Sequence, residues 1–441
     1  MTPRVPEEPR DEASRREHRQ AVVDRYQAER RLPSLVVGVL EDGRLVWSGS
    51  AGAPTTNDTQ YRIGSITKTL TAVLVMQCRD DGLLGLDNPV GRFVRESGYG
   101  SASVRSLLAH VSGMQSEPVG PWWERSPGVG TAQLLADNDG SGAVFAPQEH
   151  FHYSNLAYGL LGELVTRLRG ESWWSLVKSQ ILEPLGMART SYLPEGEHAQ
   201  GWSVHHLAGT VTPEPAHDAG AMAPAGQLWS TLEDLARFAG FLAGGQFGGN
   251  ADVLADESLA QMRRSVEPAP DYGLGVRLVP WPGGMLVGHN GSMPGFQATT
   301  YADPLSGVGV VALTNGTTGF NGPELALALL GDRTPGRIEP WVPTEQVPDW
   351  ALELLGYWHW GNSAFEARWN RDASGERLEW RDLARSRLAE TFERAGDGRI
   401  LGTAGYHHGE TLELVRHADG TLDHLECATF VYTRTPYPLG A

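Results

Sequence analysis

The spacing of apolar and polar residues divides the chain into a mixed region and a later region of short strands. Near the start, residues 35–40 and 44–47 are apolar runs separated by Asp42-Gly43, a dipeptide typical of a type I′ hairpin turn. We expect two antiparallel strands there, after a charged helical lead-in. Strand-like runs return late in this region, at residues 272–279, 285–289, 297–301 and 308–313.

Helical periodicity begins directly after Ser65 and continues to about Arg79. This pattern predicts a long buried helix with Ser65 at its N-terminus. Residues 100–245 combine helical stretches, such as 156–167 and 231–242, with loops rich in Gly and Pro. The early hairpin and the late strands therefore predict one antiparallel sheet built from both ends of a domain, flanked by helices, with a helical region inserted.

The last part of the chain has a different pattern. Residues 335–349 are rich in proline, which is typical of a linker. Beyond them, short alternating segments surround turn signals at Ser374-Gly375, Asp397-Gly398, Gly409 and Asp419-Gly420. This spacing predicts a small all-β barrel or sandwich of about 90 residues. The expected fold class is thus α+β, with a main domain over residues 1–334, a linker over 335–349 and a β domain over 350–441.

Composition and charge exclude several classes of function. The chain has 441 residues and a formal net charge of −17, which opposes nonspecific binding to nucleic acid or to an anionic membrane. No apolar run approaches the roughly 18 residues of a spanning helix. Residues 1–20 are dense in Arg and Glu and lack the apolar stretch of a secretory signal. We therefore expect a cytoplasmic protein without nucleic-acid or membrane partners.

Cysteine and metal-ligand patterns are sparse. Cys78 and Cys427 are the only cysteines and fall in the two expected domains, so no disulfide framework is predicted and both are interpreted as small buried hydrophobes. The sequence contains no Walker loop, no His-Glu-x-x-His motif and no Gly-x-Ser-x-Gly elbow. His205-His206 is a conceivable metal pair, but a polar loop explains it more simply. We expect no cofactor and no metal.

A candidate catalytic pair stands at the start of the long helix. Ser65 and Lys68 are three residues apart, so their side chains share one helix face, within about 6 Å at the Cβ atoms. A lysine without its proton can take the serine proton, and a helix N-terminus stabilises negative charge beside it. The alternative is an ordinary solvated lysine. Among 36 basic residues only Lys68 and Lys178 are lysines, which favours a position that requires an amine.

Two further segments carry polar groups that can face the same cleft. Residues 153–155 (Tyr-Ser-Asn) precede a helical stretch, and residues 289–292 (His-Asn-Gly-Ser) end a predicted strand. Each has a plain structural alternative, a surface loop for the first and a satisfied structural histidine for the second. In the second segment we expect Gly291 to let a substrate approach the backbone.

In this order along the chain, these elements resemble those of penicillin-recognising serine enzymes of the class C β-lactamase and D,D-peptidase type. The resemblance covers about residues 20–330, with supporting segments at 107–113, 181–187 and 230–238. It implies that Ser65 is the nucleophile, that Lys68 and Tyr153 share the work of the base, and that Asn155 orients Lys68 and a substrate amide. The backbone N–H groups of Ser65 and Ser292 would form the oxyanion hole.

Two details refine this expectation. Tyr153 can act as a base only if its pKa falls well below the usual value of about 10, which a nearby cation such as Lys68 or His289 can cause. Many members of the resembled group carry a lysine where this chain has His289, whereas esterase and aminopeptidase branches use histidine. β-Lactamase activity is therefore the less favoured expectation.

Two features outside these motifs point to a substrate class. Residues 117–125 form a turn-rich loop with Trp122 and Trp123, either an aromatic wall beside the cleft or a purely structural loop. Together with the β domain, this loop is similar to penicillin-binding-protein-type thioesterases, which cyclise nonribosomal peptides and end in a lipocalin-like domain. Arg434, after the last apolar strand, is either a substrate-binding residue that reaches the cleft or a solvated side chain.

That resemblance implies a stand-alone cyclase. Its substrate would be a peptidyl thioester with a D-configured C-terminal residue, held on a peptidyl carrier protein or as a small molecule, and its product a head-to-tail macrolactam. The alternatives are an intracellular hydrolase with water as the acceptor, either an esterase or a D-amino-acid or D,D-carboxypeptidase-like peptidase, and a catalytically silent binding protein. The intact set Ser65, Lys68, Tyr153 and Asn155 argues against the last of these.

Overall fold

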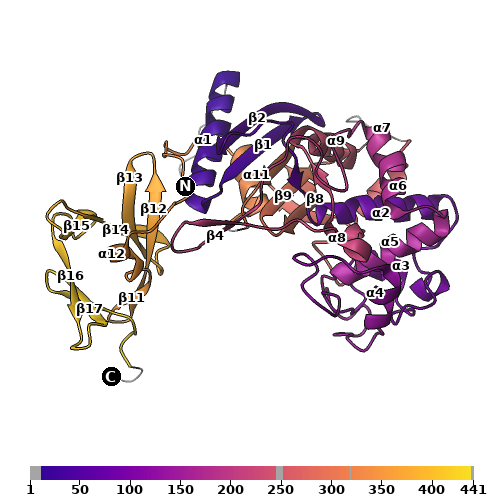
Figure 1. Ribbon diagram of the computed structural model, residues 1–441. Coiled ribbons are helices and arrows are strands. Elements are labelled where there is room, and N and C mark those ends of the chain that lie inside the picture. The colour runs from indigo at the N-terminus through magenta and orange to yellow at the C-terminus, as the bar shows by residue number, and fades with distance from the viewer. Residues whose placement is uncertain (1–10, 245–251, 318, 439–441) are drawn as a thin grey trace, which may run out of the picture.

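A six-stranded antiparallel sheet forms the base of the first part of the chain (Figure 1). The computed structural model describes residues 11–244, 252–317 and 319–438, so the first ten residues of segment 1–20 lie outside the described residues. The strand order is β2-β1-β10-β9-β8-β7. The strands span Ser34–Glu41 (β1), Arg44–Gly52 (β2), Arg277–Trp281 (β7), Gly284–Met293 (β8), Phe296–Ala302 (β9) and Gly309–Thr314 (β10).

The sheet joins the two ends of the domain, as the sequence predicts. β1 pairs with both β2 and β10, and β10 leads through β9 to β8. Between β1 and β2, Asp42 and Gly43 have φ values of 48° and 68°, the left-handed conformation that a type I′ turn requires of both central residues. The predicted strand at 272–279 begins only at Arg277, because a turn with Gly275 at φ 78° precedes it.

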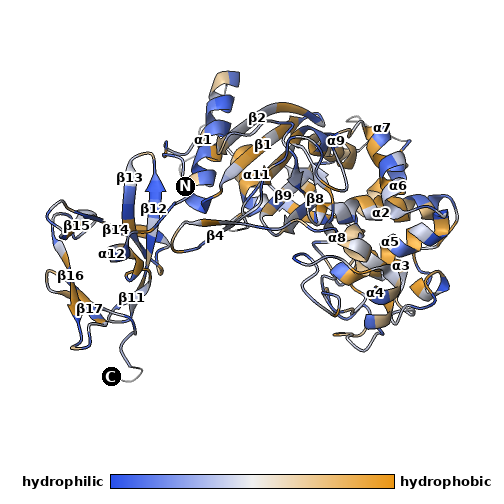
Figure 2. Ribbon diagram, in the orientation of Figure 1, coloured by the Kyte–Doolittle hydropathy of each residue, from blue (hydrophilic) through white to orange (hydrophobic). Residues whose placement is uncertain are grey.

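Helices cover both faces of this sheet. α1 and α11 pack on one face, over side chains such as Val37 and Val310, while the alternate residues Val36 and Val311 join α2 and α9 in the core on the other face. In Figure 2, β1 is mainly hydrophobic, whereas α1 also carries many hydrophilic residues. These helices span Glu12–Arg30 (α1), Ile66–Asp80 (α2), Leu232–Ala243 (α9) and Gly322–Leu330 (α11).

A helical region beside the sheet completes the domain, and its longest helix, α5, packs against α2, α3 and α8 (Figure 1). The predicted helices at 156–167 and 231–242 correspond to α5 and α9. The remaining elements are η1 (Val90–Arg92), α3 (Val104–Leu108), α4 (Thr131–Asp137), α5 (Asn155–Arg169), α6 (Trp173–Val177), the π-helical turn η2 (Lys178–Leu182), α7 (Glu183–Leu185), η3 (Gly220–Met222), α8 (Ala223–Gly226), α10 (Asp256–Met262) and the strand pairs β3 (Tyr61–Arg62) with β6 (Trp229–Ser230) and β4 (Trp202–Val204) with β5 (Val211–Pro213).

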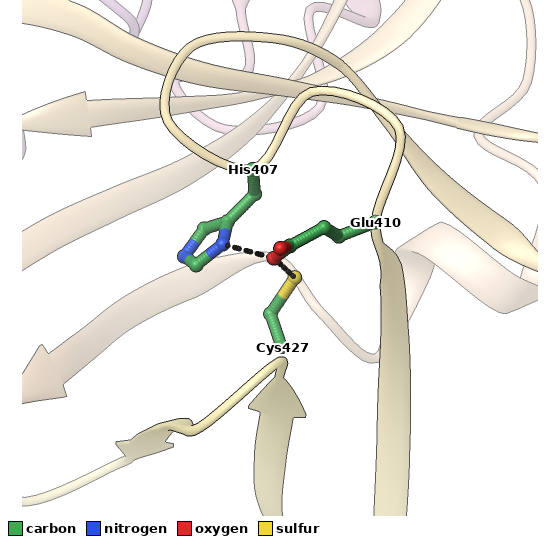
Figure 3. Close-up of side chains that lie close together, drawn as sticks. All are labelled: His407, Glu410 and Cys427. Atoms are coloured by element: carbon green, nitrogen blue, oxygen red, sulfur yellow. Dashed lines mark hydrogen bonds and ion pairs between the residues drawn. The ribbon is translucent and has the colours of Figure 1, made fainter.

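The chain then forms a closed antiparallel barrel of eight strands, β11 to β18, around an aromatic core that includes Trp358 and Trp380. This confirms the predicted small all-β domain. At one end of it, His407, Glu410 and Cys427 lie together (Figure 3). The elements are α12 (Asp349–Leu352), β11 (Gly356–Trp360), β12 (Ser363–Asp372), β13 (Gly375–Asp382), β14 (Arg387–Arg394), β15 (Ile400–Ala404), β16 (Thr411–Arg416), β17 (Leu422–Cys427) and β18 (Phe430–Thr433).

The barrel contacts the first domain beside the C-terminal end of α1. The buried guanidinium of Arg31 donates to the carbonyl oxygens of His206 (3.1 Å) and Trp369 (2.8 Å), and burial lowers the pKa of Arg31 to about 9. His206 Nε2 lies 2.6 Å from Glu366 Oε1 on β12. His205 Nδ1 instead accepts two backbone N–H groups of its own loop. The two histidines thus serve the loop and the junction, in agreement with a polar-loop interpretation.

The segment that connects the two domains also contacts α1. Gln27 Nε2 on α1 donates to the carbonyl oxygen of Trp341 (2.9 Å), and the Trp341 side chain is buried. The linker limits 335–349 stay a prediction. Both cysteines are buried and free, as predicted. Over the part of the chain that is described, no helix is both long and apolar enough to cross a bilayer.

Candidate active site

Ser65 stands at the N-terminus of α2, where the sequence places it. Lys68 Nζ donates to Ser65 Oγ over 2.9 Å and to the carbonyl oxygen of Ala225 on α8 over 2.6 Å. The serine hydroxyl does not cap the helix, so its oxygen is available for chemistry. The predicted contact between the two side chains is therefore present, and Lys68 is fixed from two directions.

Lys68 is completely buried. Burial lowers the pKa of this amine from 10.5 to about 7, and Arg277 adds to the effect, while the carboxylates of Glu117 and Glu124 oppose it. The ammonium also lies 5.1 Å from the centre of the Tyr153 ring. Near neutral pH a large share of Lys68 is thus the free amine, which can accept the proton of Ser65. An ordinary solvated lysine is excluded.

Tyr153 lies beside this pair but does not meet the condition for a base. Burial raises the pKa of its phenol above the usual value, although a hydrogen bond with Ser65 and the charge of Arg277 act in the opposite direction. The condition under which the sequence favours Tyr153 as a base, a lowered pKa, is therefore not met. Tyr153 keeps its proton as a hydrogen-bonding partner of Ser65, which leaves Lys68 as the candidate base of the expected pair.

Asn155 opens α5 but does not hydrogen-bond to Lys68, contrary to the expectation that it orients the lysine. Its Nδ2 donates to Glu117 Oε1 over 2.6 Å, while its Oδ1 is buried without a partner. The partners of the Lys68 ammonium are instead Ser65 Oγ and the carbonyl oxygen of Ala225. The free Oδ1 remains an acceptor for a substrate amide, the other half of the prediction.

His289 lies on β8 and is also buried. Its Nδ1 faces the carbonyl oxygen of Asn290, and its Nε2 lies 2.9 Å from the Tyr272 hydroxyl. Beyond Tyr272, His110 Nε2 lies 3.2 Å from the same hydroxyl, and His110 Nδ1 accepts the backbone N–H of Ser154 over 3.0 Å.

These bonds allow one assignment of protons. Because Nδ1 of His110 accepts, its Nε2–H donates to Tyr272, whose hydroxyl donates to His289, whose Nδ1–H donates to Asn290. Burial, with Arg277 as a further cause for His289, lowers the pKa of both imidazoles well below the usual value. His289 is neutral, so it does not supply the cation expected beside Tyr153.

The backbone around Ser65 is packed against the end of β8. A Cβ on Gly64 would lie 2.5 Å from the Ser292 nitrogen, which shows that the Ser65 turn and Ser292 are neighbours, as the expected oxyanion hole requires. A Cβ on Gly291 would lie 1.8 Å from the carbonyl oxygen of Ile63. The lack of a side chain at Gly291 therefore lets the turn before Ser65 pack against β8. This corrects the expectation that Gly291 makes room for a substrate.

The two tryptophans of the loop 117–125 differ in burial. Trp123 is 7% exposed, belongs to the core and donates through Nε1 to Glu117 Oε2 over 2.7 Å. Trp122 is 58% exposed and lies under the guanidinium of Arg125. Only Trp122 is free to touch a substrate, so the pair does not form a continuous aromatic wall.

Arg434 does not reach the active site. Its guanidinium donates to the carbonyl oxygens of Glu353, Leu355 and Tyr357, and it stacks 3.8 Å from the Trp358 ring. All of these partners lie at the start of the barrel, so Arg434 joins the last strand to the first. Its predicted substrate-binding role is wrong, and the alternative of a solvated side chain is also too simple.

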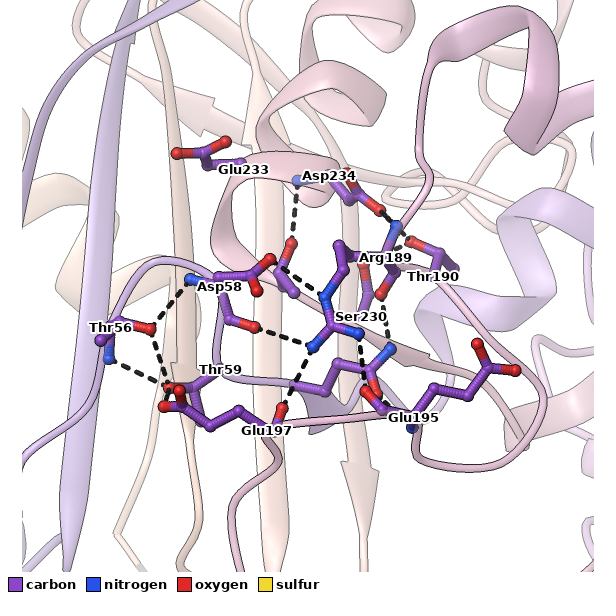
Figure 4. Close-up of polar contacts among 12 residues, drawn as sticks. Thr56, Asp58, Thr59, Arg189, Thr190, Glu195, Glu197, Ser230, Glu233 and Asp234 are labelled. Carbon is purple, nitrogen blue, oxygen red and sulfur yellow. Dashed lines mark hydrogen bonds and ion pairs between the residues drawn. The ribbon is translucent and has the colours of Figure 1, made fainter.

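A polar network holds the segment that leads to Ser65 (Figure 4). Arg189 donates through Nε to Asp58 (3.0 Å), and its backbone N–H donates to Asp234 in the first turn of α9 (2.8 Å). Thr59 Oγ1 donates to Glu197 Oε1 over 2.6 Å. Since β3 and the Ser65 turn follow directly, these bonds help to fix the position of Ser65.

Sequence reasoning missed several residues of the site. Glu117 connects Trp123 to Asn155, and Arg277 at the start of β7 lies 5.8 Å from the Tyr153 and Tyr272 rings. Arg277 and Tyr272 carry no motif signal of their own. Both fall within the run 272–279 that the sequence predicts as a strand, and this is the one clue that the sequence offers, because β7 begins beside the His289 segment: Arg277 pairs with Gly288.

This geometry defines an acyl-serine site of the β-lactamase and penicillin-binding-protein type. A model of the β-lactamase family matches residues 19–331, and the chain belongs to that family. A second model, a domain of unknown function (DUF7586), matches residues 347–434. Penicillin-binding protein 4 of Amycolatopsis lactamdurans is 30% identical over 376 residues, which cover 77% of this chain and 96% of that protein.

Solved structures give the same fold. A D-stereospecific amidohydrolase from Streptomyces sp. is 25% identical, with a TM-score of 0.58 and coverage of 70% of this chain and 96% of that one. The structure of SurE with D-Leu is 24% identical, with a TM-score of 0.59, and covers 96% of this chain and 100% of that one. The match to SurE therefore includes the barrel.

Proposed function

We propose that this chain is a stand-alone thioesterase that cyclises a peptidyl thioester with a D-configured C-terminal residue and releases a head-to-tail macrolactam. One observation carries the acyl-transfer chemistry: Ser65 Oγ accepts a hydrogen bond from a buried Lys68 whose pKa lies at about 7. The substrate would be a peptidyl thioester that is either attached to a peptidyl carrier protein or free as a small molecule. Such thioesters are made inside the cell, so the proposal places the enzyme in the cytoplasm.

The first step is acylation. The Ser65 proton moves to Lys68 Nζ as Ser65 Oγ bonds to the thioester carbonyl carbon, and the backbone N–H groups of Ser65 and Ser292 hold the oxyanion. The C–S bond then breaks, and the leaving thiolate takes the proton back from Lys68. The products are a free thiol and a peptidyl ester on Ser65. Because neutral Lys68 is needed, we expect the acylation rate to rise with pH through about 7.

The second step is ring closure. The peptide's N-terminal amine attacks the ester carbonyl, the C–O bond to Ser65 breaks, and Lys68 passes the proton lost by the amine to Ser65 Oγ. Holding the amine beside the ester lowers the activation free energy of ring closure by up to roughly 7–11 kcal/mol, compared with an amine free in solution. Glu117 and Glu124 lie close enough to Lys68 to affect its pKa, and their charge favours the approach of an amine rather than an anion.

The D configuration is supported by the relatives. The Streptomyces enzyme is named as D-stereospecific, and SurE was solved with D-Leu. Both share this fold, and the Streptomyces match covers 70% of this chain. We therefore propose that the acyl residue on Ser65 has D configuration.

A hydrolase with water as the acceptor is the second candidate, as an esterase or as a D-amino-acid or D,D-carboxypeptidase-like peptidase. The amidohydrolase and the 30% identity to penicillin-binding protein 4 favour it. β-Lactamase activity is less favoured, because the position where many such enzymes carry lysine holds a neutral, fully engaged His289.

The test offers one peptidyl thioester with a free N-terminal amine and a C-terminal D-residue, and its L-epimer as the matched control. Products are weighed by mass spectrometry. A product one water lighter than the linear acid, formed from the D-substrate only, is the expected result. Linear acid alone would reject the cyclase and leave the hydrolase, and equal turnover of both epimers would reject the stereochemical claim.

A further inference from the structure

Three side chains of types that bind transition metals converge at one end of the barrel (Figure 3). His407 and Glu410 lie on the turn between β15 and β16, and Cys427 is the last residue of β17. Their ligand atoms all lie within 4.8 Å of one another. None of these residues belongs to the active site described above, and His407 and Cys427 are almost completely buried.

The distances between these atoms suit a shared metal ion. Imidazole nitrogen, thiolate sulfur and carboxylate oxygen bind Zn²⁺ at about 2.0–2.3 Å in tetrahedral sites, so two ligand atoms of one ion lie roughly 3.3–3.8 Å apart. In the structure, His407 Nδ1 and Glu410 Oε2 are 3.0 Å apart, and Cys427 Sγ and Glu410 Oε2 are 4.0 Å apart. Small side-chain adjustments bring both into this range.

A purely hydrogen-bonded cluster accounts for these groups less well. At 4.0 Å the contact between the Cys427 thiol and the Glu410 carboxylate is at the outer limit for a sulfur hydrogen bond. The Glu410 side chain is 44% exposed, so it does not need the thiol in order to be solvated. The same exposure gives an ion a path from solvent and leaves a coordination position for water.

A second layer of contacts orients the histidine. His407 Nε2 lies 2.8 Å from the Tyr432 hydroxyl, and the His407 backbone N–H donates to Glu390 Oε2 over 3.1 Å. When Nε2–H donates to Tyr432, Nδ1 is the nitrogen with a free lone pair, and this atom faces Glu410 and Cys427. Metal-binding histidines are commonly oriented in this way by a partner of the second ring nitrogen.

Charge in this part of the barrel favours a cation. Glu390 is buried and lies next to the cluster, because its Oε2 accepts the backbone N–H of His407. A divalent ion compensates the charge of the Glu390 and Glu410 carboxylates and of a thiolate together.

From this geometry we propose that His407 Nδ1, Glu410 and Cys427 Sγ bind one Zn²⁺ ion, with water as the fourth ligand. The ion would join the turn between β15 and β16 to the end of β17. β15 and β16 pair at Ile400 with Leu412 and Leu401 with Thr411, and backbone hydrogen bonds join Gly402 to Gly409 and Glu410, so the ion would add a side-chain connection from this turn to β17. The metal is thus a structural element of the barrel, and it does not depend on the proposed function of Ser65.

The test uses the full chain, freed of any affinity tag and treated with a chelator. Zn²⁺ is titrated by calorimetry, and Co²⁺ is added as a spectroscopic probe, because a cobalt thiolate gives a charge-transfer absorption in the near ultraviolet. We expect one ion per chain, a thiolate band with Co²⁺ and a higher melting temperature of the Zn²⁺-loaded protein.

Three variants complete the experiment. Cys427→Ala should abolish the cobalt thiolate band. Glu410→Gln changes a half-exposed side chain and should leave folding intact. It should weaken Zn²⁺ binding by more than about 10-fold, because loss of a residue that only orients a metal ligand already lowers affinity by that much. Cys78→Ala removes the other thiol of the chain and should change neither result. Absence of a bound ion in the wild-type chain, or a thiolate band that survives in Cys427→Ala, would overturn the proposal.

Discussion

At the scale of single residues, Lys68 shows how the requirements of folding and of chemistry conflict. Its amine is completely buried, and burial brings its pKa from 10.5 to about 7. A residue that carries no charge would suit this position better in terms of stability. The reaction, however, requires a group that can take a proton from Ser65 and return it.

We predict that Lys68→Met stabilises the protein while it lowers turnover by about 10²–10⁴-fold. The unfolded chain holds the lysine proton up to pH 10.5, whereas the folded chain loses it near 7, so between these values wild-type stability rises with pH. The stability difference between Lys68→Met and wild type should therefore shrink by about 1.4 kcal/mol per pH unit from pH 7 to 9.

Urea denaturation at several pH values measures this difference. Lys178→Met is the matched control, since it changes the other lysine of the chain, whose side chain lies outside the active site. A stability difference that does not change with pH would mean that the pKa of Lys68 is close to its ordinary value.

The sequence was a good guide to Ser65 and Lys68, because a spacing of three residues on a helix determines that the side chains meet. It was a poor guide to their surroundings. Tyr272 and His110, which hold His289, and Glu117, which holds Asn155, come from separate segments and meet only through tertiary packing. The pKa of Tyr153 depends on that packing too, so its direction could not be predicted.

At the scale of elements, the contact between β8 and the turn before α2 sets the active-site geometry. We predict that Gly291→Ala destabilises the protein by about 1–3 kcal/mol, because its Cβ would lie 1.8 Å from the Ile63 carbonyl oxygen. Displacement of the Ser65 turn should lower kcat roughly 10²-fold. Thermal unfolding and steady-state kinetics measure the two effects.

Gly85→Ala is the comparison for this variant. A Cβ there meets only ordinary contacts with Asn88, at 3.5 Å, so stability and kcat should stay close to wild type. If Gly291→Ala behaved like Gly85→Ala, the close approach of β8 to the Ser65 turn would be refuted.

The order and type of most elements could be predicted, because apolar periodicity and glycine-containing turns mark them. The barrel illustrates the limit of this approach. Its turns at Gly375, Gly398 and Gly420 were expected, whereas those at Ser386 (φ 50°) and Ala428 (φ 52°) were not. Serine and alanine do not mark a left-handed position in the sequence as glycine, asparagine and aspartate do.

At the scale of the whole molecule, the buried Arg31 joins the two parts of the chain. We predict that Arg31→Ala weakens this junction by about 1–3 kcal/mol, because the loss of its guanidinium leaves the carbonyl oxygens of His206 and Trp369 without these donors. Limited proteolysis should then cleave faster within residues 331–348.

Arg30→Ala is the control for the junction. Arg30 pairs with Glu324 at the surface of the first domain, so its loss should change stability by less than about 1 kcal/mol and should not speed cleavage. Equal cleavage rates in the two variants would contradict the role of Arg31. The placement of the barrel is beyond sequence reasoning, which is why a substrate-binding role for Arg434 stayed one of two alternatives.

The account as a whole depends on a covalent bond between the substrate's acyl group and Ser65. The most direct measurement is the intact mass of the protein after brief mixing with a peptidyl thioester that ends in a D-residue and has a blocked N-terminal amine. We predict a mass increase of one acyl group, located by peptide mapping on Ser65 and absent in Ser65→Ala. An adduct on another residue, or turnover that persists in Ser65→Ala, would contradict the mechanism.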